Sequence, residues 1–255
     1  MHAKSLTKSV TDFLAVVRGY CKNHNISLNN QLFLTGYSEG GYVTLSVQKE
    51  IEENSAQEFS LTAVAPMAGP YDLLATSDRL LQQANYQWPV YVAFLFYAYD
   101  KLYGWNRLHE IFNEPYGSMI PSLFNGSKTF AEINSQLPTD VTSLVKPAFI
   151  YDYFSGNEEA IRNALRENTL LSWKPLAPVH FFHGDSDNVS LYQNSLTAVD
   201  SLTANGGTEV LLTTIPGGTH ATASLPSLLG AIVWFNSKRS NSPLMAMDIN
   251  GKNYD

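Results

Sequence analysis

The sequence has one cysteine, few charged residues and no apolar run long enough to cross a membrane, and each shortage excludes a class of protein. Cys21 has no partner in the chain, which excludes an internal disulfide and a cysteine-based zinc site. Charged residues make up only 15% of the chain, the formal net charge is -7, and no basic run is longer than Lys238-Arg239. A surface that follows nucleic-acid phosphates is therefore not expected. The most apolar stretch, Trp88 to Tyr99, has twelve residues and is too short for a transmembrane helix.

The histidines show no metal-binding pattern. His2, His24 and His109 lack ligand spacing. His180 and His183 lie on the same apolar stretch, and we interpret both as structural. The ring of His183 is expected to form a hydrogen bond with a nearby turn. The sequence predicts neither a metal nor another cofactor.

The apolar content is high enough for a single domain with an insertion, because 44% of the 255 residues are hydrophobic. Periodicity predicts helices over residues 5–24, 39–53 and 221–235, the last packed on a sheet. It predicts strands near residues 31–36, 61–65, 178–183 and 209–215. Alternating helices and strands predict an α/β protein, with a parallel sheet, right-handed crossovers and helices on both faces.

The most informative motif is Gly36-Tyr37-Ser38-Glu39-Gly40, which follows the apolar run Leu32-Phe33-Leu34 and precedes a predicted helix. A nucleophile elbow consists of a strand, the G-x-S-x-G motif and a helix in this order, and its strained turn exposes the serine. Ser38 is therefore the candidate nucleophile. The side chain of Glu39 is interpreted as a favourable charge at the helix start, and its backbone N–H as an oxyanion donor.

Two candidate partners for Ser38 follow later strands. The strand that contains His183 runs into Gly184-Asp185-Ser186-Asp187, and the next strand runs into Pro216-Gly217-Gly218-Thr219-His220. These positions lie past strand ends, on the side where parallel sheets bind ligands. His220 is expected to activate the serine, and an aspartate to orient the imidazole. Asp187 and Asp185 are both candidates for that aspartate, since they lie two residues apart.

Residues 2–238 resemble α/β-hydrolases, in particular secreted bacterial lipases and esterases related to fungal secretory lipases. The resemblance rests on these motifs and on the stretch Ala65-Pro66-Met67-Ala68-Gly69-Pro70-Tyr71-Asp72-Leu73. The resemblance implies a triad of Ser38, Asp187 and His220, because similar hydrolases place the acid four residues after the histidine of His-Gly-x-x-Asp. It also implies ester hydrolysis through an acyl-enzyme, and a secreted or periplasmic location. A serine peptidase of the same fold and a non-catalytic hydrolase-fold protein are the alternatives.

Residues 76–172 are expected to form a helical insertion, too long for an ordinary connection, that acts as a lid over Ser38. Aromatic residues crowd its first part. They form either a helix buried between lid and body or an acyl-binding surface for a small-molecule ester or lipid. The expected substrate contacts are Tyr37, Tyr71, Trp88, Phe94 and Phe96.

The hydrolases that this chain resembles have a long region before the serine, whereas only 37 residues precede Ser38. A full sheet of this fold has about eight strands, and its second oxyanion N–H comes from a loop after the third strand. No HGGG-type loop precedes Ser38. We therefore expect the carboxyl-terminal part of a longer hydrolase, weakly active on its own. Its expected parts are a core (residues 1–75 and 173–240), the lid and a polar tail (residues 241–255).

Overall fold

A computed structural model describes residues 1–240 of the chain, in which the strands form one four-stranded sheet. In spatial order these strands are β1 (Phe33–Tyr37), β2 (Ala63–Met67), β3 (Val179–Gly184) and β4 (Val210–Ile215), and every neighbouring pair is parallel. The predicted parallel sheet is confirmed, with strands close to the expected positions. Because the strands run in one direction, their carboxyl ends meet at one rim of the sheet. The predicted tail lies outside the described residues.

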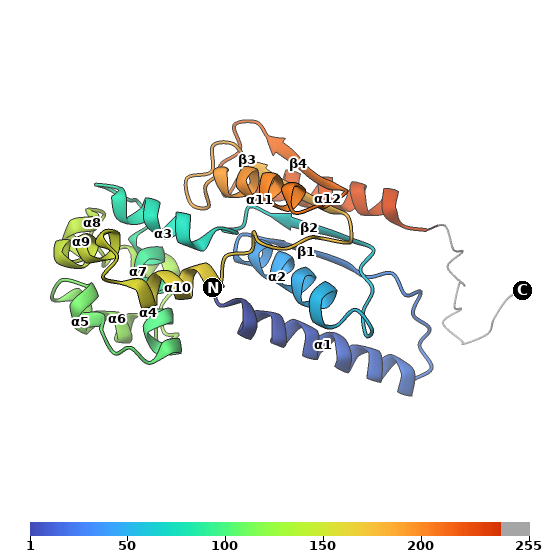
Figure 1. The fold of residues 1–255 in the computed structure, drawn as a ribbon, viewed down its shortest axis with the longest axis horizontal. Coiled ribbons are helices and arrows are strands. Elements are labelled where there is room, and N and C mark those ends of the chain that lie inside the picture. The colour runs from blue at the N-terminus through green and yellow to red at the C-terminus, as the bar shows by residue number, and fades with distance from the viewer. Residues whose placement is uncertain (241–255) are drawn as a thin grey trace, which may run out of the picture.

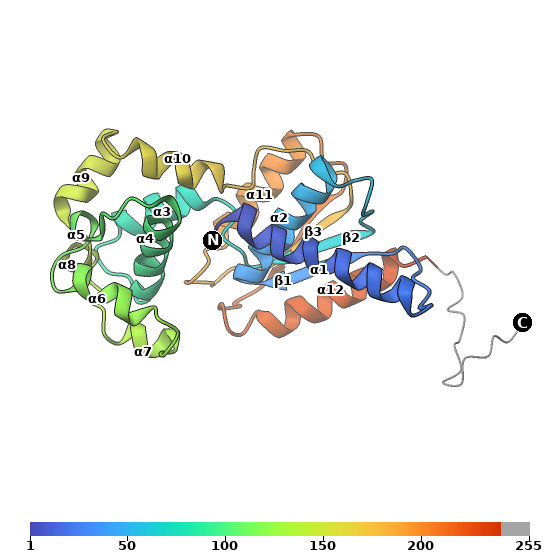
Figure 2. The ribbon, with the colours of Figure 1, turned by 90° about the horizontal axis from the view of Figure 1, so that it is seen from below.

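Helices cover both faces of the sheet (Figure 1, Figure 2). The crossover helices α2 (Glu39–Asn54) and α11 (Gln193–Ala204) share one face, as right-handed connections require, and α12 (Ser224–Lys238) covers the other. On the outer side of α2 lies α1 (Ala3–Asn23), which is joined to α2 by a buried hydrogen bond of 2.9 Å between the hydroxyls of Thr7 and Ser46. None of the described helices is both long and apolar enough to span a bilayer.

Helix α12 packs on the sheet, as predicted, but several of its large apolar side chains do not take part. Leu225, Leu229 and Val233 are exposed, at 62%, 54% and 70%. Small residues make the closest contact with the sheet: Ala231 is fully buried, and a Cβ on Gly230 would lie 2.6 Å from the ring of Phe182. Trp234 and Phe235 pack beside them, with ring centroids 5.1 Å from His180 and 5.0 Å from Phe33. Close approach to β3 therefore places small residues at the centre of this contact, which an apolar count along the helix does not reveal.

Between β2 and β3 the chain forms a helical body at one end of the sheet, which we call the cap (Figure 2). Its helices are α3 (Leu73–Gln82), α4 (Pro89–Tyr103), α5 (Leu108–Ile111), α6 (Tyr116–Leu123), α7 (Phe130–Asn134), α8 (Val141–Leu144), α9 (Pro147–Ser155) and α10 (Glu159–Glu167).

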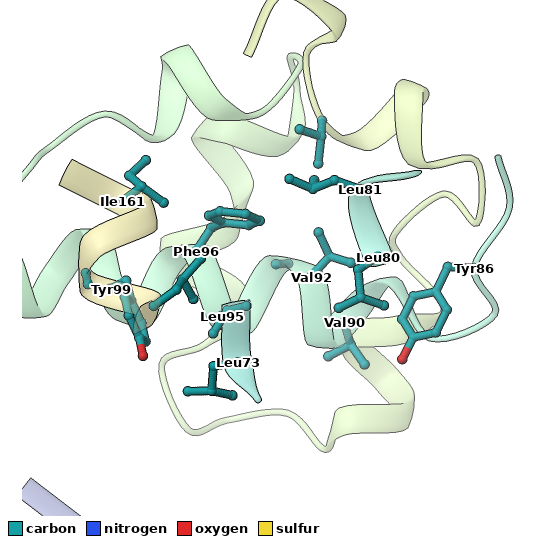
Figure 3. Close-up of a cluster of buried hydrophobic side chains, with 14 of the residues drawn as sticks. Leu73, Leu80, Leu81, Tyr86, Val90, Val92, Leu95, Phe96, Tyr99 and Ile161 are labelled. Carbon is teal, nitrogen blue, oxygen red and sulfur yellow. The ribbon is translucent and has the colours of Figure 1, made fainter. Parts of the chain in front are cut away.

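The interior of the cap is apolar and continues into the core beside the sheet. Figure 3 shows Leu80 and Leu81 of α3 near Val92 and Phe96 of α4, within one buried cluster. The same cluster includes Tyr42 of α2, whose hydroxyl donates a 2.7 Å hydrogen bond to the Asn168 carbonyl just after α10. The cap is therefore held against the α2 side of the molecule.

Candidate active site

Ser38 lies on a strained turn between β1 and α2. Its backbone has φ 59° and ψ −122°, a conformation that is costly for a residue other than glycine. Its N–H donates to the Met67 carbonyl at 2.9 Å, which ties the turn to the end of β2. The serine therefore stands at the carboxyl rim of the sheet, as expected for a nucleophile elbow.

Two glycines permit this turn sterically. A Cβ on Gly36 would lie 2.3 Å from the Gly40 carbonyl oxygen, and a Cβ on Gly41 would lie 2.3 Å from the Met67 carbonyl oxygen. By contrast, a Cβ on Gly40 would meet nothing within 4 Å. The steric requirement thus falls on the first glycine of G-x-S-x-G and on the glycine that follows the motif.

His220 is brought to Ser38 by the loop after β4. Its Nε2 lies 2.9 Å from Ser38 Oγ, and its Nδ1 lies 2.6 Å from Asp187 Oδ2. The Tyr37 hydroxyl donates to the His220 carbonyl at 2.7 Å. Burial, followed by the negative charge of Asp187, raises the pKa of Tyr37 to about 12, so this hydroxyl keeps its proton at neutral pH. The residue before the nucleophile therefore holds the histidine loop.

The Asp187 side chain is fully buried and accepts hydrogen bonds on both oxygens. Oδ1 accepts from the backbone N–H groups of Val189 and Ser190 at 2.9 and 3.0 Å, while Oδ2 faces His220, with His183 Nε2 3.3 Å away. Burial favours the protonated acid, but hydrogen bonds from His183 and His220 outweigh it and lower the pKa of Asp187 to about 2. This carboxylate is ionised at neutral pH.

Asp185, the alternative acid, has a different place. Its side chain is exposed, and its Oδ1 accepts the N–H of Gly217 at 2.7 Å. Asp185 therefore braces the turn that follows β4. Of the two aspartates, only Asp187 is hydrogen-bonded to His220 among the described residues.

The two histidines of β3 have structural partners. His183 is buried between the Ser195 hydroxyl and the Ser190 carbonyl, at 2.7 Å from each, which agrees with the expected bond to a nearby turn. Because a carbonyl can only accept, Nε2 carries the proton and Nδ1 accepts from the serine. His180 contacts the Thr213 hydroxyl at 2.8 Å, and burial lowers its pKa to about 4. Within residues 1–240 no group of three or more His, Cys, Asp or Glu side chains could hold a metal ion.

A mostly apolar cavity of about 80 Å³ lies beside Ser38, between the sheet rim and the cap. It is lined by Met1, Ser38, Glu39, Pro70, Leu73, Thr76, Leu80, Tyr86, Tyr91, Phe94, Leu95, Phe130, Val189 and Ser190. A larger groove of about 520 Å³ lies along α1 and α2, has many polar side chains and does not include Ser38. The small cavity is therefore the relevant one for chemistry at the serine.

Of the five expected substrate contacts, Phe94 lines this cavity and four others lie elsewhere. Tyr37 contacts His220, and the fully buried Tyr71 accepts the Gly69 N–H at 3.2 Å. Trp88 precedes α4 and is 36% exposed, whereas Phe96 packs inside the cap (Figure 3).

Helix geometry explains why Phe94 and Phe96 separate. Residues two apart on a helix point in nearly opposite directions, so one helix cannot present both to the same cavity. The cavity side of α4 is instead formed by Tyr91, Phe94 and Leu95, at the i, i+3, i+4 spacing of one helical face. That spacing is visible in the sequence, whereas the contribution of Phe130 from the distant α7 is not.

No family model and no curated protein matches the sequence. Solved structures do match the fold. The rice cell wall degrading esterase LipA from Xanthomonas oryzae has a TM-score of 0.80 and 24% identity, over 93% of this chain and 67% of LipA. A putative hydrolase from Legionella pneumophila has a TM-score of 0.87 and 23% identity, over 95% of this chain and 66% of that protein.

Candida antarctica lipase A, in its closed state, has a TM-score of 0.69 and 18% identity, over 87% of this chain. The chain thus spans 67% of the length of LipA and 52% of the length of this lipase. With the parallel sheet and its helices, these matches show that the chain has the α/β-hydrolase fold, which it shares with this esterase and this lipase.

Proposed function

We propose that this protein is a carboxylic ester hydrolase of the esterase or lipase type, with Ser38, His220 and Asp187 as its catalytic triad. The strongest support is the hydrogen-bond path from Ser38 Oγ to His220 Nε2 at 2.9 Å and from His220 Nδ1 to Asp187 Oδ2 at 2.6 Å. The strained backbone of the serine and the apolar cavity beside it add to this support.

In the first half of the reaction, Ser38 Oγ attacks the ester carbonyl carbon while His220 Nε2 takes the hydroxyl proton. The oxyanion that forms accepts the N–H of Glu39, the first residue of α2. The bond to the alcohol oxygen then breaks, and the alcohol leaves with the proton from His220. An acyl group remains on the serine.

In the second half, water attacks the acyl carbon and gives a proton to His220, which returns it to Ser38 Oγ as the acid leaves. Because the pKa of Asp187 is about 2, its carboxylate stays ionised and stabilises the imidazolium. We also propose that residues 1–75 and 173–240 form the catalytic core and that residues 76–172 act as a lid.

The proposal is tested by measuring hydrolysis of p-nitrophenyl esters and labelling by a fluorophosphonate, each with the wild type and with Ser38→Ala. We expect wild-type hydrolysis and labelling, and neither in the folded variant. A wild type that shows neither reaction would contradict the proposal for this chain. Equal labelling of the two proteins would place the reactive group elsewhere.

A comparison with aminoacyl p-nitroanilides separates an esterase from a peptidase of the same fold. We expect a higher kcat/KM for the esters, because the cavity at Ser38 is lined mainly by apolar side chains and offers little to orient a peptide backbone. A higher kcat/KM for the anilides would instead establish a peptidase.

A further inference from the structure

The geometry points to a small acyl pocket beside Ser38, with Phe130 as the outer side chain of its cap wall, so that the enzyme takes esters of acyl chains of up to about four carbons. This inference rests on the proposed function, because it concerns the acyl group that Ser38 would receive. It identifies Phe130 as the residue that sets acyl-chain length.

The first step is the size of the cavity. Its volume is about 80 Å³, which holds about three groups of the size of water at about 30 Å³ each. With the carbonyl carbon held at Ser38 Oγ, about three further carbons fill this space. Longer chains require either a gap in the wall or displacement of a side chain.

The second step is the character of the wall. Leu73, Leu80 and Leu95 line the cavity with exposures of 0%, 7% and 5%, so the cap interior supports them from behind. Such side chains cannot move aside without disturbing a packed core. The leucine side of the cavity is therefore rigid.

The third step is that the wall is thin at Phe130. This side chain is 43% exposed, so one part of it contacts the cavity and another part contacts solvent. Its ring lies 5.5 Å from that of Tyr91 and 5.6 Å from that of Phe94, which places it as the outer member of an aromatic cluster. Removal of this one ring would open the pocket to the outside.

The fourth step is that local structure fixes Phe130 in place. It is the first residue of α7, and Thr129 and Glu132 form a capping box there: Thr129 N–H donates to Glu132 Oε2 at 2.7 Å, and Glu132 N–H donates to Thr129 Oγ1 at 3.3 Å. Asn134 on the same short helix accepts the Val90 N–H at 3.2 Å, which ties α7 to the start of α4. The ring is thus held in the cavity wall by its own helix.

The test is a chain-length profile of kcat/KM on p-nitrophenyl esters from acetate to hexadecanoate. Wild type is expected to be fastest on esters of two to four carbons and to fall at least tenfold by octanoate. Phe130→Ala is expected to raise the octanoate-to-butanoate ratio at least tenfold, since each methylene buried is worth about fourfold. Phe130→Trp is expected to lower the butanoate-to-acetate ratio.

The matched control is Phe154→Ala. Phe154 lies on α9 of the cap, is 41% exposed and does not line the cavity, so the same truncation there is expected to leave the profile unchanged. Circular dichroism verifies the fold of each variant. If Phe130→Ala does not fold, the opposite shift expected for Phe130→Trp still decides the role of Phe130.

Labelling rates with ethyl and dodecyl fluorophosphonates give a second readout that needs only attack by Ser38. A wild type that is as fast on dodecanoate as on butanoate, or equal profiles for Phe130→Ala and Phe154→Ala, would overturn the short-pocket inference while the ester hydrolase stands. No labelling and no hydrolysis at any chain length would overturn the proposed function and, with it, this inference.

Discussion

At the scale of single residues, the two aspartates after β3 have separate roles. Asp187 holds His220, whereas Asp185 holds the backbone of Gly217. Asp187→Asn is expected to lower kcat about 10⁴-fold, because an amide cannot keep the imidazole in the tautomer that accepts the serine proton. Asp185→Asn is expected to cost less than tenfold, since an amide oxygen can still accept the Gly217 N–H.

Steady-state kinetics of both variants on one p-nitrophenyl ester provide the comparison. A larger loss in Asp185→Asn than in Asp187→Asn would contradict the assignment of the acid.

The lowered pKa of Asp187 also predicts how the stability of the protein depends on pH. Its pKa is lowered from 3.8 to about 2 in the folded protein, so its carboxylate stabilises the fold at pH values above 3.8. This contribution is lost as the pH falls from 3.8 towards 2 and amounts to about 2 kcal/mol. Urea unfolding of wild type and Asp187→Asn between pH 6 and pH 2 measures it. We expect the difference in unfolding free energy to shrink with falling pH, and a constant difference would count against this source of stability.

At the scale of elements, the turn from β1 to α2 depends on which glycines lie in close contact with the backbone, and the G-x-S-x-G pattern alone does not identify them. Gly41→Ala places a methyl group 2.3 Å from the Met67 carbonyl oxygen and forces α2 away from β2. We expect it to destabilise the protein by about 2 kcal/mol or more, through overpacking. Gly40→Ala meets nothing within 4 Å and is expected to be neutral, or stabilising by up to about 1 kcal/mol.

Thermal unfolding of the two variants, side by side, measures this contrast. The predicted order of stability is Gly40→Ala above Gly41→Ala, and the reverse order would mean that the packing of α2 on β2 has been misjudged.

At the scale of the whole molecule, one side combines a sheet edge with two exposed apolar helix faces. β1 is an edge strand, and α1 and α12 flank it in Figure 2. Phe13, Val16 and Tyr20 of α1 are 57% to 68% exposed, and α12 exposes Leu229 and Val233. Open strand edges and apolar patches of this kind promote association.

We therefore expect the 255-residue chain to self-associate in a concentration-dependent way. The double variant Leu229→Glu with Val233→Lys is expected to shift light-scattering masses towards the monomer, because both side chains face solvent. Ala231→Glu, on the buried side of the same helix, is the contrasting change and is expected to unfold the protein. A strictly monomeric wild type would contradict the prediction.

Much of the fold was predictable because its signals are local. Four apolar runs, with predicted helices before and after the first, indicate a parallel sheet, and a glycine-flanked serine after the first run indicates the elbow. Ser38, Asp187 and His220 could be named as candidates since each follows a strand, and parallel strands end at one rim. The structure places these three side chains in hydrogen-bond contact.

Tertiary packing decided the features that depend on distant segments. The space beside Phe182 decides which face of α12 meets the sheet. The wall of the cavity includes Phe130, which is 92 residues from Ser38 in sequence. A helical period shows that a face is apolar, but not what covers it. Such choices follow from which surfaces fit together at close range, and only the folded chain brings those surfaces into contact.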